Sequence, residues 1–174
     1  MKLVKIFALI IICFHFDGIF AQKNIFDIAR TGTLVDIKKA AIADPKCLNL
    51  KNENGYTPLI LACYRGNLEV AKFLIENSKT VNISCDMGTP LMAATYKGQT
   101  EIVQLLLDNN ANPNIADANG TTPLIFCAMF GNEKILDLLL KYKVNKQQKD
   151  KEGKTAFEFA VFSGNEKIIN KLKN

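Results

Sequence analysis

A short apolar phrase recurs four times along this chain at an almost constant interval. It stands as "GYTPLILACYRG" at 55–66, "GTPLMAATYKG" at 88–98, "GTTPLIFCAMFG" at 120–131 and "GKTAFEFAVFSG" at 153–164. The threonines of successive copies are 32, 33 and 33 residues apart. Self-similarity at this period is typical of stacked supersecondary units, none of which can bury its apolar face alone. The sequence therefore predicts a linear array of repeats.

Each copy carries the residues that begin and end a helix. A threonine such as Thr57 can cap a helix N-terminus, and the proline after it loses no hydrogen bond at the first helical position. The glycine nine residues after the threonine suits the left-handed conformation that ends a helix. Apolar residues at helical spacing, such as Val70, Phe73 and Leu74, predict a second helix. Segments rich in Asn, Asp and Gly, such as 109–120, then predict a turn or hairpin.

The phrase and its period resemble the ankyrin repeat family. The resemblance rests on Thr-Pro-Leu at 57–59, 89–91 and 122–124, followed by alanine and glycine, and covers residues 24–174. It implies an all-α fold, an α-solenoid of about five helix–turn–helix repeats joined by β-hairpin-like fingers. The expected units are an entry cap at 24–51, repeats at 52–84, 85–116 and 117–149, and an exit cap at 150–174.

Two departures from the family pattern affect what we expect. The histidine that follows Thr-Pro-Leu in the family is replaced by Ile60, Met92, Ile125 and Glu158. We expect packing to replace the hydrogen bonds of this histidine between repeats, with modest stability per repeat. One residue is missing before Thr89, which predicts a blunted hairpin at the entry to the third unit.

The first residues have the order of a secretory signal peptide. Lys2 and Lys5 precede an apolar run over 6–14, and the small residue Ala21 suits a cleavage site before Gln22. The run is too short to span a bilayer, which takes about 20 residues. We predict a signal peptide at 1–21 and an exported ankyrin-type domain at 22–174, periplasmic or secreted, without stable insertion in a membrane. The alternative is a buried N-terminal helix or strand.

Composition argues against catalysis and nucleic-acid binding. The only histidine is His15, within the predicted signal peptide, which leaves no Ser-His or Cys-His pair and no histidine metal site. We therefore predict no enzyme activity, no cofactor and no metal. A net charge of +5 is mild for a nucleic-acid-binding protein.

The cysteines show no paired Cys-x-x-Cys spacing, so a zinc site has almost no support. Cys63 and Cys127 lie on first helices two repeats apart, about 20 Å at the usual helix spacing, which is too far for a disulfide. Both are predicted to be buried free thiols. Cys47 and Cys85 lie in connections, and the sequence leaves their redox state open.

Candidate contact residues come from the resemblance, which implies partner recognition by first helices and hairpin tips. On the first helices and just before them, the candidates are Tyr56, Tyr64, Arg65, Tyr96, Lys97, Met129, Phe130 and Phe162. At the hairpin tips they are Glu53, Asn54, Met87, Ala118, Asn119 and Glu152. The alternative for the aromatic residues is that they pack against neighbouring repeats.

These observations predict a non-catalytic, monomeric module that binds another protein in the periplasm or outside the cell, as inhibitor, scaffold or protective partner. One alternative is docking on anionic lipid or glycan through the lysine cluster at 141–154, although a solvated hairpin explains that cluster more simply. Another is an effector released toward a second cell. The identity of the partner is not encoded in any motif.

Overall fold

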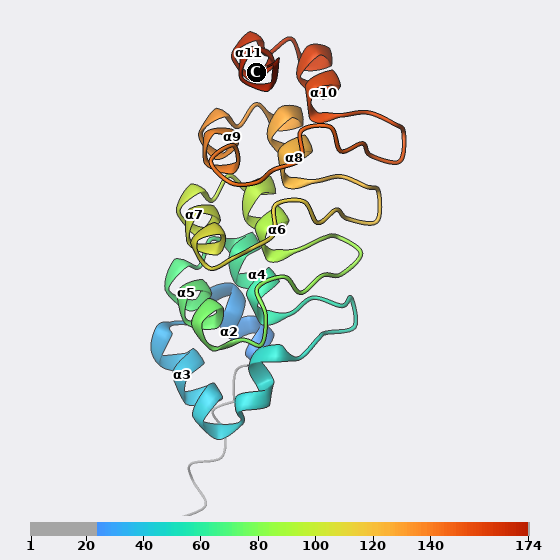
Figure 1. The fold of residues 1–174 in the computed structure, drawn as a ribbon. Helices are drawn as coiled ribbons and strands as arrows, with labels where there is room; N and C mark the ends of the chain where they lie inside the picture. The colour runs from blue at the N-terminus through green and yellow to red at the C-terminus, as the bar shows by residue number, and fades with distance from the viewer. Residues whose placement is uncertain (1–23, 174) are drawn as a thin grey trace, which may run out of the picture.

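The computed structural model describes residues 24–173, which form two columns of helices with a row of loops projecting from one side (Figure 1). The predicted signal peptide at 1–21 lies outside the described residues. The first helix of each unit is α2 (Ile25–Thr31), α4 (Pro58–Arg65), α6 (Pro90–Tyr96), α8 (Pro123–Phe130) or α10 (Ala156–Ser163). The second is α3 (Leu34–Ala43), α5 (Leu68–Asn77), α7 (Thr100–Asp108), α9 (Glu133–Leu139) or α11 (Glu166–Lys173), and a 3₁₀ helix, η1 (Pro45–Asn49), follows α3.

The capping chemistry predicted from the phrase is present in α4, α6, α8 and α10. The threonine hydroxyl before each of these helices accepts a hydrogen bond from the backbone N–H three residues on, as from Ile60 to Thr57 at 3.3 Å. Three of the helices end at a glycine in the left-handed region, such as Gly66 with φ 74°. The helix α6 ends one residue earlier, at Tyr96, and Gly98 still has φ 70°.

The core lies between the two columns. Each first helix packs on the first helices before and after it, and each second helix does the same in its own column. The leucines of the phrase are buried against the second helices, and the alanines at 62, 94, 128 and 160 are fully buried, which allows close helix approach. The described residues thus form the all-α solenoid expected from the sequence.

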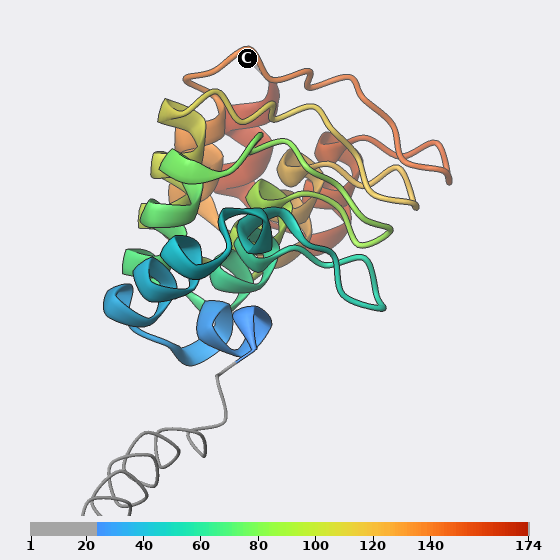
Figure 2. The same ribbon diagram turned by 90° about the horizontal axis from the view of Figure 1, so that it is seen from below.

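The loops that enter α4, α6, α8 and α10 project beyond the helices, as the second view shows (Figure 2). We call them finger 1 (52–56), finger 2 (85–88), finger 3 (117–121) and finger 4 (150–154). In finger 1 the Asn52 N–H donates to the Tyr56 carbonyl at 3.0 Å, and the Asn52 side chain accepts from two further backbone N–H groups. Fingers 3 and 4 repeat this pattern from Asp117 and Asp150.

Finger 2 is shorter because of the missing residue. It closes as a two-way bridge between Cys85 and Gly88, with N···O distances of 3.1 and 2.9 Å. A cysteine stands where the other fingers have Asn or Asp, so no side-chain amide or carboxylate braces this turn. Among the described residues this bridge is the only β pairing, so the fingers resemble hairpins without forming strands.

Packing replaces the family's histidine at three of its four positions, and hydrogen bonds elsewhere also join the repeats. Ile60, Met92 and Ile125 do pack where the family has histidine, since all three are buried. Asparagines after the second helices, however, also join successive units. The Asn82 side chain accepts from the Asn112 N–H at 2.8 Å and donates to the Asn110 carbonyl at 3.2 Å.

Asn114 repeats this arrangement one unit later. Its side chain accepts from the Asn145 N–H at 2.7 Å and donates to the Lys143 carbonyl at 2.8 Å. At the fourth position of the missing histidine, Glu158 instead forms a capping box with Thr155. The hydrogen bonds from Thr155 stabilise the carboxylate and lower the pKa of Glu158 below its ordinary value.

Candidate functional site

Four aromatic rings from three consecutive first helices meet on the side of the helices that faces the fingers. We call Tyr64, Tyr96, Phe126 and Phe130 the aromatic cluster. The Tyr64 and Tyr96 rings are stacked with centroids 6.3 Å apart, and Tyr96 meets Phe126 and Phe130 edge-on at 5.8 and 5.3 Å. Phe126 and Phe130 are themselves stacked at 6.0 Å. These distances are those of favourable aromatic pairs.

The sequence left open whether these aromatic residues contact a partner or pack against neighbouring repeats, and the structure is compatible with both. The rings pack on one another across repeats, yet Tyr64 keeps 39% of its surface exposed, Tyr96 47% and Phe130 56%. Each ring is therefore held in place by its neighbours while presenting a face to solvent. A preordered, half-exposed aromatic surface loses little side-chain entropy when a partner covers it.

Phe126 was not predicted from the sequence. The candidates were taken from the two residues before each helix-ending glycine, whereas Phe126 lies four residues before Phe130. Residues at this spacing share one face of a helix, and that spacing is the signal that could have found it. At the equivalent position α6 has Ala93, which leaves room for Phe126 beside Tyr96.

A groove of about 570 Å³ runs along the aromatic cluster between the first helices and the fingers. Five of the predicted helix-side candidates line it: Tyr56, Tyr64, Arg65, Tyr96 and Met129. Two predicted finger-tip residues, Met87 and Asn119, line its opposite side. We call this space the concave groove.

Family membership follows from comparison with known sequences. The family model described as "Ankyrin repeats (3 copies)" matches residues 25–117 and 106–174. This chain belongs to the ankyrin repeat family. Repeats of this family generally mediate protein–protein interaction and are typically non-catalytic. Among curated proteins, none matches the sequence.

The helix side of the concave groove in this ankyrin array is cationic. The Lys97 ammonium lies 5.0 Å from the centroid of the Tyr64 ring and 6.0 Å from that of Tyr96, within the range of a cation–π interaction. Arg65 is exposed and has no salt bridge among the described residues. Asp117 also lines the groove, but one of its carboxylate oxygens already accepts the N–H groups of Asn119 and Thr121.

The remaining candidates lie away from the aromatic cluster. Phe162 is 93% exposed and makes no ring contact within the described part of the chain. The finger-tip candidates Glu53, Asn54, Ala118 and Glu152 are exposed but do not line the concave groove.

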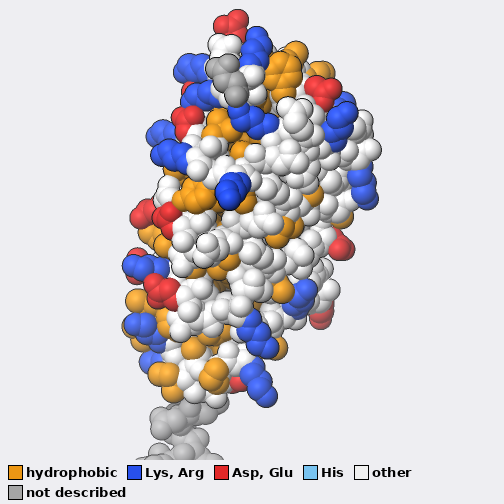
Figure 3. Space-filling view, in the orientation of Figure 1, with side chains coloured by type: hydrophobic (Ala, Val, Ile, Leu, Met, Phe, Trp, Pro, Cys, Tyr) orange, Lys and Arg blue, Asp and Glu red, His pale blue; other side chains and the backbone are white. Residues whose placement is uncertain are grey.

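The lysine cluster at 141–154 is not uniformly exposed and unpaired. Lys154 pairs with Glu152 at 2.7 Å, and Lys146 is only partly exposed. In the view of Figure 3, basic side chains are interspersed with acidic ones along both edges of the array. Nearby, Lys171 and Lys167 on α11 pair with Asp137 and Glu133 on α9.

Two of the four thiols, those of Cys63 and Cys127, are unreactive because they are buried. Cys63 and Cys127 are free and buried as predicted, and Cys47 and Cys85 are free as well. Burial raises the pKa of the Cys63 and Cys127 thiols far above the ordinary value, so neither is a thiolate at neutral pH. Within residues 24–173, no group of side chains could hold a metal ion. In the same range no helix has the length and apolar character needed to cross a membrane.

Proposed function

We propose that this ankyrin protein binds another protein in its concave groove, through the aromatic cluster and the cationic side chains beside it. It acts outside the cytoplasm, as an inhibitor, scaffold or protective partner of an exported protein. The proposal on location rests on the order of charged, apolar and small residues in 1–21.

The observation that carries the proposal is the aromatic cluster itself. Its rings come from three repeats and form one continuous surface that is about half exposed. Tyr and Arg are enriched among the residues that dominate binding energy at protein interfaces. Repeats of this family are typically non-catalytic interaction modules, and an exposed, preordered aromatic surface suits contact with a partner.

The test compares two sets of exposed aromatic residues. The variants are the double substitution Tyr64→Ala with Tyr96→Ala, and the control Phe162→Ala outside the aromatic cluster. Each is used to capture proteins from the envelope and secreted fractions of the source cells. We expect the wild-type chain and the Phe162→Ala control to retain the same partner, and the double variant to lose at least about 2 kcal/mol of affinity for it.

Folding is checked in parallel by circular dichroism and melting temperature. Because the rings pair with one another, the double variant is expected to lose some stability, about 0.5–1.5 kcal/mol per ring pair. Partner affinity is therefore measured well below the melting temperature of both variants. Equal partner binding by the wild-type chain and the folded double variant would contradict the proposed function.

A further inference from the structure

The stack of fingers is continuous except at one junction. The Ala118 N–H of finger 3 donates to the Asp86 carbonyl of finger 2 at 3.1 Å, and the Lys151 N–H of finger 4 donates to the Asn119 carbonyl of finger 3 at 2.9 Å. Between fingers 1 and 2 the described residues make no such main-chain bond. Only the Lys51 side chain reaches across, to the Ser84 carbonyl at 3.3 Å.

At this junction, the main-chain groups that would form the bond between fingers 1 and 2 are equivalent to those that form it between the other fingers. By register, the Asp86 N–H of finger 2 corresponds to the Ala118 and Lys151 N–H groups, and the Asn54 carbonyl of finger 1 corresponds to that of Asn119. Finger 2 is one residue shorter than its neighbours, so it does not reach finger 1 in the same way. One donor and one acceptor of the main chain are thus left without a main-chain partner on the two sides of the junction.

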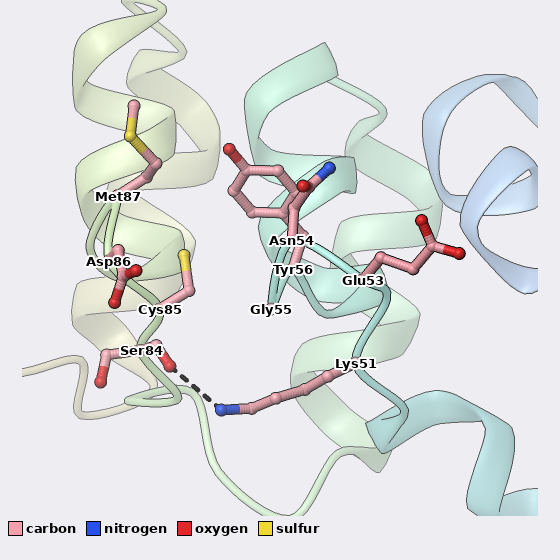
Figure 4. Close-up of a pocket in the computed structure, with 9 residues that line it drawn as sticks. All are labelled: Lys51, Glu53, Asn54, Gly55, Tyr56, Ser84, Cys85, Asp86 and Met87. Carbon is pink, nitrogen blue, oxygen red and sulfur yellow. Dashed lines mark hydrogen bonds between the residues drawn. The ribbon is translucent and has the colours of Figure 1, made fainter.

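A cleft of about 690 Å³ separates the two fingers (Figure 4). Tyr56 and Asn54 stand on the finger 1 side, and Cys85 and Met87 on the finger 2 side, while Glu53 points away. Tyr56 and Met87 also line the concave groove. The finger cleft and the concave groove therefore adjoin at Tyr56 and Met87, and we call the two together the depression.

Charge varies along this depression. At the helix end, Arg65 and Lys97 have no carboxylate partner among residues 24–173, and Arg30 is paired with Asp27 at 2.9 Å. At the finger end, the exposed Asp86 and the Lys51 ammonium, which donates to the Ser84 carbonyl, both line the cleft. The middle is the apolar surface of the aromatic cluster. A peptide that complements the helix end and the middle carries an acidic residue at one end and an apolar residue next to it.

We propose, on the basis of the function proposed above, that the depression takes one extended peptide segment of the partner protein. A large apolar side chain of this segment rests on the aromatic cluster, and an acidic side chain pairs with Arg65 and Lys97. The main chain then passes through the finger cleft, where it donates to the Asn54 carbonyl and accepts from the Asp86 N–H. Main-chain pairing of this kind supplies affinity, while the apolar and acidic side chains supply selectivity.

The probe is a peptide selected for binding to the purified chain. Random twelve-residue peptides displayed on phage are selected on the wild-type chain after depletion on the Tyr64→Ala, Tyr96→Ala double variant. We expect the enriched sequences to combine an aromatic or long aliphatic residue with Asp or Glu at a fixed distance. Enrichment of basic sequences, or of none, would overturn the proposed partner class.

The strongest enriched peptide is then synthesised and tested on charge variants. Arg65→Glu with Lys97→Glu is expected to weaken its binding at least about tenfold, the loss typical of a charge-assisted contact. The control is Lys72→Glu with Lys141→Glu, which changes the net charge equally at exposed positions outside the groove. Equal losses in both would show that only overall charge matters and would overturn the specific pairing.

The finger cleft is tested by restoring the missing residue. Insertion of one Asn after Asp86 gives finger 2 the length of its neighbours and is expected to close the cleft, with about tenfold weaker peptide binding and no loss of melting temperature. The control is the same insertion after Glu152 in finger 4. Unchanged peptide binding by the Asp86 insertion would remove the cleft from the site.

Failure of this inference is distinguishable from failure of the proposed function. If the natural partner depends on Tyr64 and Tyr96 but the selected peptides lack acidic residues, the partner class is wrong and the groove remains the binding site. If the natural partner binds the double variant normally, the proposed function itself is wrong.

Discussion

The helices α8 and α10 carry the same phrase, yet their side chains differ sharply in exposure. Six residues after the capping threonine, Ala128 of α8 is fully buried, whereas Val161 of α10 is 52% exposed. One residue further on, Met129 is 41% exposed and Phe162 is 93% exposed. Both pairs are apolar, so the difference does not come from hydropathy.

The difference comes from the neighbouring repeats. The helix α8 packs on α6 and α10, so both of its flanks are covered, whereas α10 packs on α8 and its own second helix α11. In a solenoid each interface is shared between two units, and stability is close to a sum of repeat and interface contributions. Identical residues therefore contribute more in a central unit than in one with a single neighbour.

The largest effect that tests this comparison concerns the second helices. Leu106 in α7 and Leu172 in α11 occupy equivalent positions and are 0% and 6% exposed. Leu106→Ala is expected to lower the free energy of unfolding by about 2–5 kcal/mol, the range for a buried leucine. Leu172→Ala should cost less, because fewer neighbours surround the cavity. Chemical denaturation measures both, and equal costs would contradict the neighbour argument.

A smaller effect concerns the asparagines that join the units. Asn114 bonds to two backbone groups of the following unit, whereas Gln147, 33 residues later, makes no side-chain hydrogen bond within the described residues. Asn114→Ala is expected to cost about 0.5–1.5 kcal/mol, because it removes two hydrogen bonds between units whose backbone groups water can reach. Gln147→Ala is the matched control and should change stability by less than about 0.5 kcal/mol. A silent Asn114→Ala would show that water replaces both bonds freely.

The sequence predicts the local features of the fold better than those that span repeats. The helix α4 begins at Thr57 and Pro58 and ends at Gly66 through contacts within a few residues. The local sequence is therefore sufficient to predict both ends of this helix. The hydrogen bonds of Asn82 and Asn114, by contrast, reach groups about 30 residues away. Nothing in an Asn-rich loop distinguishes such bonds from ordinary turn formation.

The candidate site shows the same division. The sequence places Tyr64 and Tyr96 on equivalent helix faces, because each lies two residues before the last glycine of its copy of the motif, Gly66 or Gly98. Phe162 meets the same rule but stands alone, since its role depends on a neighbouring ring rather than on its own helix. The finger cleft arises because finger 2 is one residue shorter than its neighbours. The missing residue is visible in the sequence, but the gap that it leaves becomes apparent only when the fingers are stacked side by side.

The smallest expected effect is a gain in stability, in the central unit rather than in the last one. Thr95 of α6 and Val161 of α10 occupy the same position of the phrase, and Thr95 is 4% exposed with a hydroxyl that has no hydrogen-bond partner. Thr95→Val keeps the shape and removes the unsatisfied group, so it is expected to stabilise the chain by about 1 kcal/mol. Val161→Thr places a hydroxyl in solvent and should change stability by less than about 0.5 kcal/mol. Thermal and chemical denaturation of the two variants measure both values. A loss of stability in Thr95→Val would mean that its hydroxyl finds a partner in solution, and the central position would then tolerate polarity as readily as the exposed one.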